Sequence, residues 1–137
     1  MKSKYKAMVL SCMDPRFQHL VQNYLKKKKL TGKYSAFTIA GAAVGVTHNK
    51  FKIWHKTFYD NLATSIQLHK IEKLIVINHK DCGAAKIANG KKEYSTMTEK
   101  KIHKESFSKI KKQVKKRFPN LKIELNLISI QGKIKKY

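Results

Sequence analysis

The stretch AMVLSCMDPR (residues 7–16) places chemically active side chains directly after a short apolar run. A second stretch, LIVINHKDCG (residues 74–83), repeats this arrangement. Short, continuous apolar runs with polar borders are typical of strands buried in a parallel sheet. In open α/β sheets, ligands bind at the carboxyl ends of such strands. The two stretches therefore predict an α/β fold with a functional site assembled from two strand ends.

The rest of the sequence predicts helices that alternate with strands. Apolar residues recur at helical spacing after the first motif and again in two later segments, and a further segment before Asn89-Gly90 looks like a short helix. The predicted strands are 7–10, 34–39, 73–78 and 122–130, and the predicted helices are 17–25, 58–71, 83–88 and 103–118. Residues 46–57 are polar and aromatic without a clear period, which predicts a loop. Right-handed crossovers between strands then give a mostly parallel central sheet flanked by helices.

Length and hydropathy favour one compact, intracellular unit. A chain of 137 residues is long enough for one core and short for two, so we expect a single domain over residues 1–137. The basic start is followed by an apolar stretch that reaches only Leu10, which is too short for a secretory signal. No segment approaches the roughly 20 apolar residues of a membrane span. The sequence therefore predicts a cytoplasmic protein with no membrane contact.

The charge of the chain is strongly positive, with a formal net charge of +23 and a pI near 10.1. Such a surface attracts polyanions over long range. However, Arg16 and Arg117 are the only arginines among 31 basic residues, and the planar fork of arginine is favoured for base and phosphate recognition. We therefore expect nucleic acid to bind only non-specifically, through the lysine-rich surface.

Both cysteines of the chain lie in the two motifs. Cys12 follows the first predicted strand, and His79 and Cys82 follow the third with a spacing that lets one tight turn bring both to one ion. Two thiolates and one imidazole favour zinc, whereas a disulfide is the less expected use of two cysteines in a reducing compartment. Three protein ligands would leave one zinc position open to a water molecule, whose pKa would fall toward ~7.

The charged pair Asp14 and Arg16 alternates with Cys12, so an extended chain would direct all three side chains to one wall. Pro15 favours an extended Asp14. Arg16 would keep the Asp14 carboxylate ionised and oriented through paired hydrogen bonds. Asp14 could accept the remaining hydrogen of a zinc-bound water, or it could itself be the fourth ligand and close the site. Both alternatives are open from the sequence.

In combination, these motifs resemble the β-class carbonic anhydrases along the whole chain: CMDPR at 12–16, the turn at Ala40-Gly41, HKDCGA at 79–84, and QGK at 131–133 after the last strand. The resemblance implies the α/β fold of that family, a zinc ion bound by Cys12, His79 and Cys82, and an Asp14–Arg16 dyad that gates and orients a zinc-bound hydroxide. It implies reversible hydration of carbon dioxide to bicarbonate. It also implies a homodimer or higher homo-oligomer, because family members build their sites at a dimer interface.

Three features depart from the family pattern. TIAGA at 38–42 stands where the family usually has Arg-Asn-Ala-Gly-Asn, so polar groups that support the site and interface are lost. Only 11 residues precede Cys12, so the amino-terminal helix that embraces the partner subunit in the family is not expected. Residues 46–57 look like an insertion that could cap the site or replace the missing contacts.

Two other functions fit the same motifs. The site could hydrolyse carbon disulfide or carbonyl sulfide, as resembling proteins can, since channel shape decides which linear electrophile enters. Alternatively, the chain could be a non-catalytic basic zinc protein that binds nucleic acid. An open zinc position with the Asp14–Arg16 pair favours an enzyme, whereas a closed site would favour the binding protein.

Overall fold

A computed structural model describes residues 4–90 and 93–137 of the chain. Within these residues, five strands form one sheet in the order β2-β1-β3-β4-β5. The first four strands are parallel, and β5 pairs with β4 in the antiparallel direction. The strands are β1 Ala7–Ser11, β2 Tyr34–Thr38, β3 Lys73–His79, β4 Lys122–Ile128 and β5 Ile134–Lys136. The prediction of an α/β fold with a mostly parallel sheet is confirmed.

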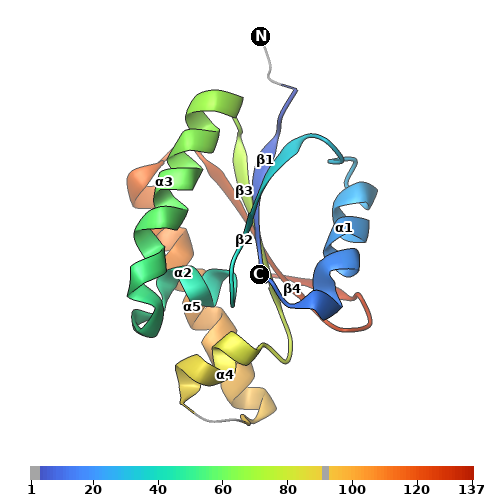
Figure 1. The fold of residues 1–137 in the computed structure, drawn as a ribbon, viewed down its shortest axis with the longest axis vertical. Coiled ribbons are helices and arrows are strands. Elements are labelled where there is room, and N and C mark those ends of the chain that lie inside the picture. The colour runs from blue at the N-terminus through green and yellow to red at the C-terminus, as the bar shows by residue number, and fades with distance from the viewer. Residues whose placement is uncertain (1–3, 91–92) are drawn as a thin grey trace.

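Helices cover both faces of the sheet (Figure 1). On one face lies α1, and on the other lie α2, α3 and α5, while α4 sits at the end of the sheet near the carboxyl ends of the parallel strands. The helices are α1 Gln18–Lys27, α2 Ala43–Thr47, α3 Lys52–His69, α4 Gly83–Asn89 and α5 Thr96–Arg117, with 3₁₀ turns at Pro15–Phe17 and Asn49–Phe51. This arrangement leaves the ends of β1 and β3 facing α4.

The core has two parts because successive side chains of a strand point to opposite faces of the sheet. From β1, Ala7 and Val9 pack on the α1 side, whereas Met8 and Leu10 pack on the side of α3 and α5. The central strand β3 is buried along almost its whole length. Burial on both faces is what produces the continuous apolar runs in the sequence.

The loop prediction for residues 46–57 is wrong. The segment holds the end of α2, a 3₁₀ turn and the first turns of α3, which begins at Lys52. Its apolar positions Phe51 and Trp54 do follow a helical spacing, which Phe58 of α3 continues, and the rings of Phe51 and Trp54 stack with centroids 4.7 Å apart. Lysines and histidines between them hide that period. The short α2 is buried on every side, so its sequence has no polar face that would reveal a helix.

Several element boundaries also differ from the prediction, most of them by one or two residues. The strand predicted over 122–130 ends at Ile128, where a turn leads into the unpredicted β5, a strand of three residues. Helix α3 ends at His69 rather than at residue 71. Helix α5 begins at Thr96, well before residue 103, because the Ser95 hydroxyl caps it by accepting a hydrogen bond from the Thr98 N–H at 3.1 Å.

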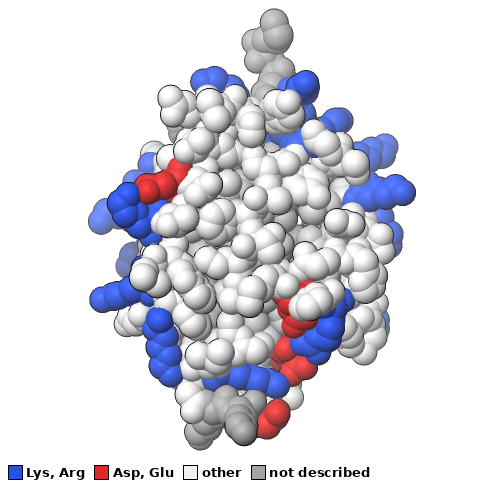
Figure 2. Space-filling view, in the orientation of Figure 1, with Lys and Arg blue, Asp and Glu red and all other residues white. Residues whose placement is uncertain are grey.

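The surface over strand β2 carries few charged side chains. Strand β2 is an edge of the sheet with β1 as its neighbour, and it lies toward the viewer in Figure 1. Figure 2, in the same orientation, shows an almost uncharged centre with lysines and arginines around the rim. We call this surface, centred on β2 residues Tyr34–Thr38, the β2 face. Among the described residues, no helix is both long and apolar enough to cross a membrane.

Candidate metal centre

Three donor side chains converge at the carboxyl ends of two adjacent strands. Strands β1 and β3 are parallel neighbours with Ser11 opposite Ile77, so Cys12 emerges beside the end of β3. His79 is the last residue of β3, and Cys82 precedes the first residue of α4. The Sγ atoms of Cys12 and Cys82 and a ring nitrogen of His79 all lie within 4.8 Å of one another. All three residues are buried, and both cysteines are free thiols.

The His79 ring presents an unused nitrogen to the two sulfurs. Its Nδ1 lies 2.7 Å from the carbonyl oxygen of Lys80, which can only accept, so Nδ1 carries the hydrogen. The ring also stacks on Phe17 with centroids 4.0 Å apart. Nε2 is buried without a hydrogen-bond partner among the described residues. A buried acceptor left unpaired is costly, and a metal-bound histidine usually has its other nitrogen hydrogen-bonded in this way. The residues therefore fit a metal ion.

The thiols of Cys12 and Cys82 contact each other and shift each other's pKa in opposite directions. The adjacent Cys82 thiol lowers the pKa of Cys12, and so do the nearby His79 ring and the Gly41 N–H, which donates to Sγ at 3.2 Å. The same contact with Cys12, together with burial, raises the pKa of Cys82. Without a metal ion, the protein therefore favours a thiolate at Cys12 and a thiol at Cys82. A divalent cation would stabilise both thiolates, which is the state that binds metal.

Gly41 brings the loop after β2 into contact with Cys12. Its φ of +80° is in the left-handed region, and a Cβ there would lie 3.0 Å from the Ala84 Cβ and 3.1 Å from the Gly45 nitrogen. Glycine is the residue that meets both conditions. The loop lacks the polar side chains expected at 38–42, but the hydrogen bond to Cys12 comes from the backbone. The loop can therefore hold Cys12 through the Gly41 N–H without those side chains.

Asp14 and Arg16 form a closely bonded pair beside the three donors. Asp14 Oδ1 accepts from the Arg16 N–H at 2.9 Å and from Nε at 3.2 Å, and Oδ2 accepts from Nη2 at 2.8 Å. The hydrogen bonds from Arg16 hold the pKa of Asp14 below its usual value. Oδ2 also lies 3.7 Å from Nε2 of His79. The chain is extended only as far as Asp14, and Arg16 returns to it through the 3₁₀ turn rather than along one extended wall.

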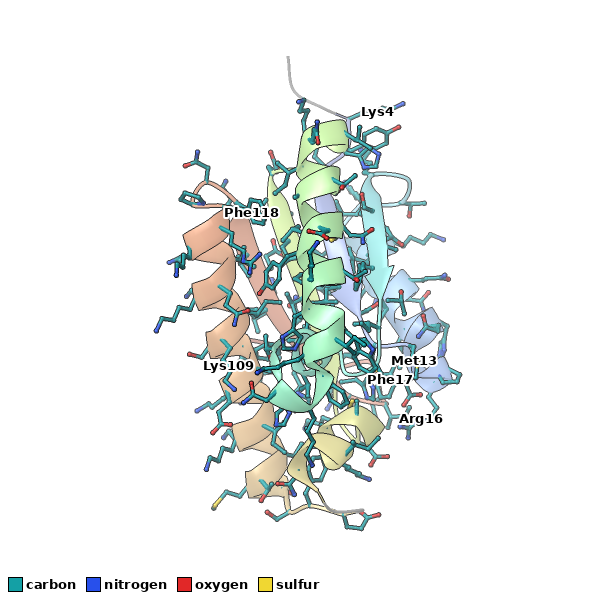
Figure 3. The ribbon with its side chains drawn as sticks, turned by 60° about the vertical axis from the view of Figure 1, so that its left-hand side comes forward. Lys4, Met13, Arg16, Phe17, Lys109 and Phe118 are labelled. Atoms are coloured by element: carbon teal, nitrogen blue, oxygen red, sulfur yellow. The ribbon has the colours of Figure 1, made fainter. Side chains whose placement is uncertain are left out.

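A pocket of about 440 Å³ opens beside these groups. Its lining is mostly small or apolar: Cys12, Met13, Asp14, Pro15, Ala40, Gly83 and Ala84. Figure 3 shows Met13, Arg16 and Phe17 close together near the start of α1. No residue of the 46–57 segment is among those lining residues, so the segment does not cap this pocket. The space suits a small molecule without charge.

Several contacts at the site are not evident in the sequence. Gln18 donates from Nε2 to the carbonyl oxygens of Cys12 and Asp14, at 2.9 and 2.8 Å, and so fixes the loop between them. Asp81 accepts from Arg16, and its own N–H donates to Glu99 of α5. The position of Asp81 between His79 and Cys82 indicates that it lies near the site, whereas nothing in the sequence around Gln18 or Glu99 indicates a contact with the site.

Comparison with known proteins places this chain in a family. Residues 1–136 match the model of a family described as "Putative carbonic anhydrase". An uncharacterized protein of Rickettsia bellii is 29% identical over 128 residues, which cover 93% of this chain and 78% of that protein. The match to the family model therefore includes both motifs and every described strand and helix.

Solved structures share the fold at low sequence identity. The β-carbonic anhydrase CafA of Aspergillus fumigatus superposes with a TM-score of 0.65 at 10% identity, covering 98% of this chain and 76% of its own. A tetrameric β-carbonic anhydrase of Sordaria macrospora gives 0.60 at 12% identity, covering 98% and 81%. With a family match over nearly its whole length and this common fold, the chain belongs to the carbonic anhydrase family of that model as a divergent, β-carbonic anhydrase-like member.

Proposed function

We propose that the chain is a zinc enzyme that reversibly hydrates carbon dioxide to bicarbonate. The observation that carries this proposal is the buried trio of Cys12, His79 and Cys82, in which Nε2 of His79 has no partner and faces two sulfurs. Two thiolates and one imidazole are a donor set typical of catalytic zinc with an open position. The family to which the chain belongs supports the same reaction.

Each polar group at the site has a separate task in this proposal. Cys12, His79 and Cys82 hold the ion, which when bound supplies a hydroxide nucleophile near neutral pH by lowering the pKa of a water toward ~7. Asp14 stays ionised and can accept a hydrogen bond from a water molecule in the pocket, which orients the oxygen lone pair toward the substrate. Arg16 occupies both oxygens of Asp14, which favours this role over direct ligation of the metal.

The pocket supports a small, uncharged substrate. Ala40, Gly83 and Ala84 leave room near Cys12 and offer no hydrogen-bonding side chain to a larger polar molecule. Carbon dioxide is linear and neutral, and its product is an anion that the positive surface attracts. Carbon disulfide and carbonyl sulfide have the same shape, so they are tested beside carbon dioxide in the experiment that follows.

Stopped-flow hydration assays on protein of known metal content test this function. We expect about one zinc per chain and hydration above buffer that rises from pH 7 to 9, since zinc-bound water typically ionises near pH ~7. Cys82→Ser keeps the size of the side chain and should lose the zinc. Full zinc retention in that variant would contradict the ligand assignment. Zinc-loaded protein that is inactive on carbon dioxide would overturn the proposal. Consumption of carbon disulfide or carbonyl sulfide would then favour the hydrolase, and consumption of neither would favour a non-catalytic protein.

We further infer that the β2 face binds a second copy of the chain. An open strand edge exposes unpaired backbone N–H and C=O groups, and this edge is surrounded by an uncharged surface in a chain of net charge +23. The tetrameric relative from Sordaria macrospora supports homo-oligomerisation.

Light scattering after size exclusion tests this interface. Ala36 is exposed on β2, so Ala36→Lys would put a charge at the centre of the face and should give monomers. Ser108→Lys adds the same charge on an exposed position of α5 and should leave the oligomer intact. A dimer that survives Ala36→Lys but not Ser108→Lys would place the interface on α5 instead.

A further inference from the structure

The guanidinium of Arg16 is shared between two carboxylates. One edge, Nε and Nη2, donates to Asp14, as described above. Nη1 donates to Asp81 Oδ2 at 3.0 Å, and Nη2 also donates to the Asp81 carbonyl oxygen at 3.0 Å. Arg16 therefore links the loop after β1 to the loop between His79 and Cys82. Its side chain is 47% exposed, so without these two anchors it would be free to turn into solvent.

Asp81 is itself held from three elements. Its backbone has φ +57°, a left-handed conformation that is uncommon for a residue other than glycine. The Asp81 N–H donates to Glu99 Oε2 of α5 at 2.9 Å, and Oδ1 accepts from Lys86 Nζ of α4 at 2.6 Å. The hydrogen bonds from Lys86 and Arg16 lower the pKa of the Asp81 carboxyl, so it is ionised at neutral pH.

Stability does not account for a carboxylate at this position. Exposed ion pairs contribute little to stability, and the side chain of Asp81 is 59% exposed. Glycine would adopt the left-handed backbone without the steric cost that a Cβ brings, so it would serve the fold about as well. What glycine would not provide is the carboxylate that accepts from Nη1 of Arg16; only the backbone carbonyl oxygen would remain.

We propose that Asp81 is a positioning residue that holds Arg16 in place and, through Arg16, keeps the Asp14 carboxylate turned toward Nε2 of His79. Without the Asp81 carboxylate, Arg16 loses its side-chain anchor on that side, and Asp14 becomes free to rotate away from His79 and the pocket. This inference rests on the proposed function in one respect, namely that Asp14 acts on water in the pocket. The geometry of Arg16 itself can be measured without any activity.

The first test uses the small number of arginines in the chain. Arg16 and Arg117 give only two side-chain Nε–H signals in a ¹⁵N NMR spectrum, and Arg16→Lys assigns them. In the zinc-loaded protein we expect Asp81→Gly to speed hydrogen exchange of the Arg16 Nε–H by about tenfold or more, with Asp81→Asn intermediate because its amide oxygen can still accept. Asp60→Asn is the matched control, since it removes the same charge from an exposed pair with Lys56 on α3. Equal protection of Arg16 in all four proteins overturns the proposal.

The second test separates positioning from structure by kinetics. Asp81→Gly should keep its zinc and lower kcat for hydration ~10-fold, the small end of the range for groups that support a metal site, with KM changed less than about twofold. In an Arg16→Lys background, Asp81→Gly should cause little further loss, because lysine lacks the planar fork that Asp81 holds. Additive losses would show that Asp81 acts independently of Arg16. If the wild-type protein has no activity, the proposed function fails, while the exchange measurement still decides whether Asp81 holds Arg16.

Discussion

At the scale of single residues, Gly41 shows how closely the site is packed. Any other residue at position 41 would have to adopt a left-handed φ, and its Cβ would make close contacts with Ala84 and Gly45. Gly32 has a similar φ of +75° with nothing within 4 Å of its Cβ position, so it is a matched control. Gly32→Ala should cost about 1 kcal/mol of unfolding free energy, and Gly41→Ala a further 1–3 kcal/mol, roughly, from overpacking. Urea denaturation measures both, and equal costs would show that the loop can move aside.

Asp14 gives the corresponding prediction for chemistry. Asp14→Asn keeps the size of the side chain but replaces one acceptor oxygen by a donor amide, so it cannot orient water in the same way. Hydration should fall ~100-fold, within the range for loss of a positioned acid or base, while zinc content and unfolding free energy change little. Metal analysis, stopped-flow assays and denaturation on one preparation check this together. Unchanged activity would remove Asp14 from the mechanism.

The sequence predicts that the site residues converge, but it does not predict the hydrogen bonds that hold them in place. Cys12 and His79 each follow an apolar run, and adjacent parallel strands bring such ends together. Contacts such as Asp81 with Glu99 depend on where α5 starts and how it packs, and short motifs contain no information about that. The roles of Cys12, His79 and Cys82 as metal ligands stay predictions until metal is measured.

At the scale of elements, buried polar contacts dock α5 on β3. The Asn78 amide donates to Nδ1 of His103 at 2.9 Å and lies 3.2 Å from the Ser106 hydroxyl, and its oxygen accepts from the Ala43 N–H of α2. His103 is fully buried, and this burial lowers its pKa from 6.5 to about 4. Because Nδ1 accepts, the ring is neutral in the folded protein. The network therefore depends on an uncharged histidine.

The His103 contacts predict a specific pH dependence of stability. Between pH 6.5 and 4 the unfolded chain binds a proton at His103 that the folded protein does not, so unfolding becomes easier as pH falls. The shift corresponds to roughly 3 kcal/mol, all present above pH 6.5. His103→Gln should remove this part of the pH dependence, so that the difference in unfolding free energy from wild type shrinks toward pH 4. His19→Gln, on the exposed side of α1, is the control, and parallel curves for wild type and His103→Gln would contradict the prediction.

Elements with one buried face were predictable, and those without were not. Helix α1 shows Val21 and Leu25 at helical spacing, and β3 is a clear apolar run. In contrast, α2 is buried all around, and β5 is short and basic at the sheet edge. The amphipathic pattern that sequence reasoning needs is absent from both, because it arises only where one side of an element contacts solvent and the other contacts the core.

At the scale of the whole molecule, the β2 face, which has few charged side chains, lies within a surface that is mostly positive. Two chains of net charge +23 repel each other wherever their lysines approach, while the face itself offers little electrostatic attraction. Salt shortens the range of this repulsion, with a Debye length of ~30 Å at 0.01 M and ~10 Å at 0.1 M. Polyanion binding has the opposite dependence, since it is driven by release of counterions.

Ionic strength therefore separates the two kinds of partner by the sign of its effect. Sedimentation velocity in rising NaCl should show self-association that tightens, while binding of a short duplex DNA in the same buffers should weaken steeply. A dimer that falls apart on adding salt would require an interface built from ion pairs, whereas the centre of the β2 face has few charged side chains in the view of Figure 2. The protein should consequently be most monomeric in dilute buffer, the condition in which it binds nucleic acid most tightly.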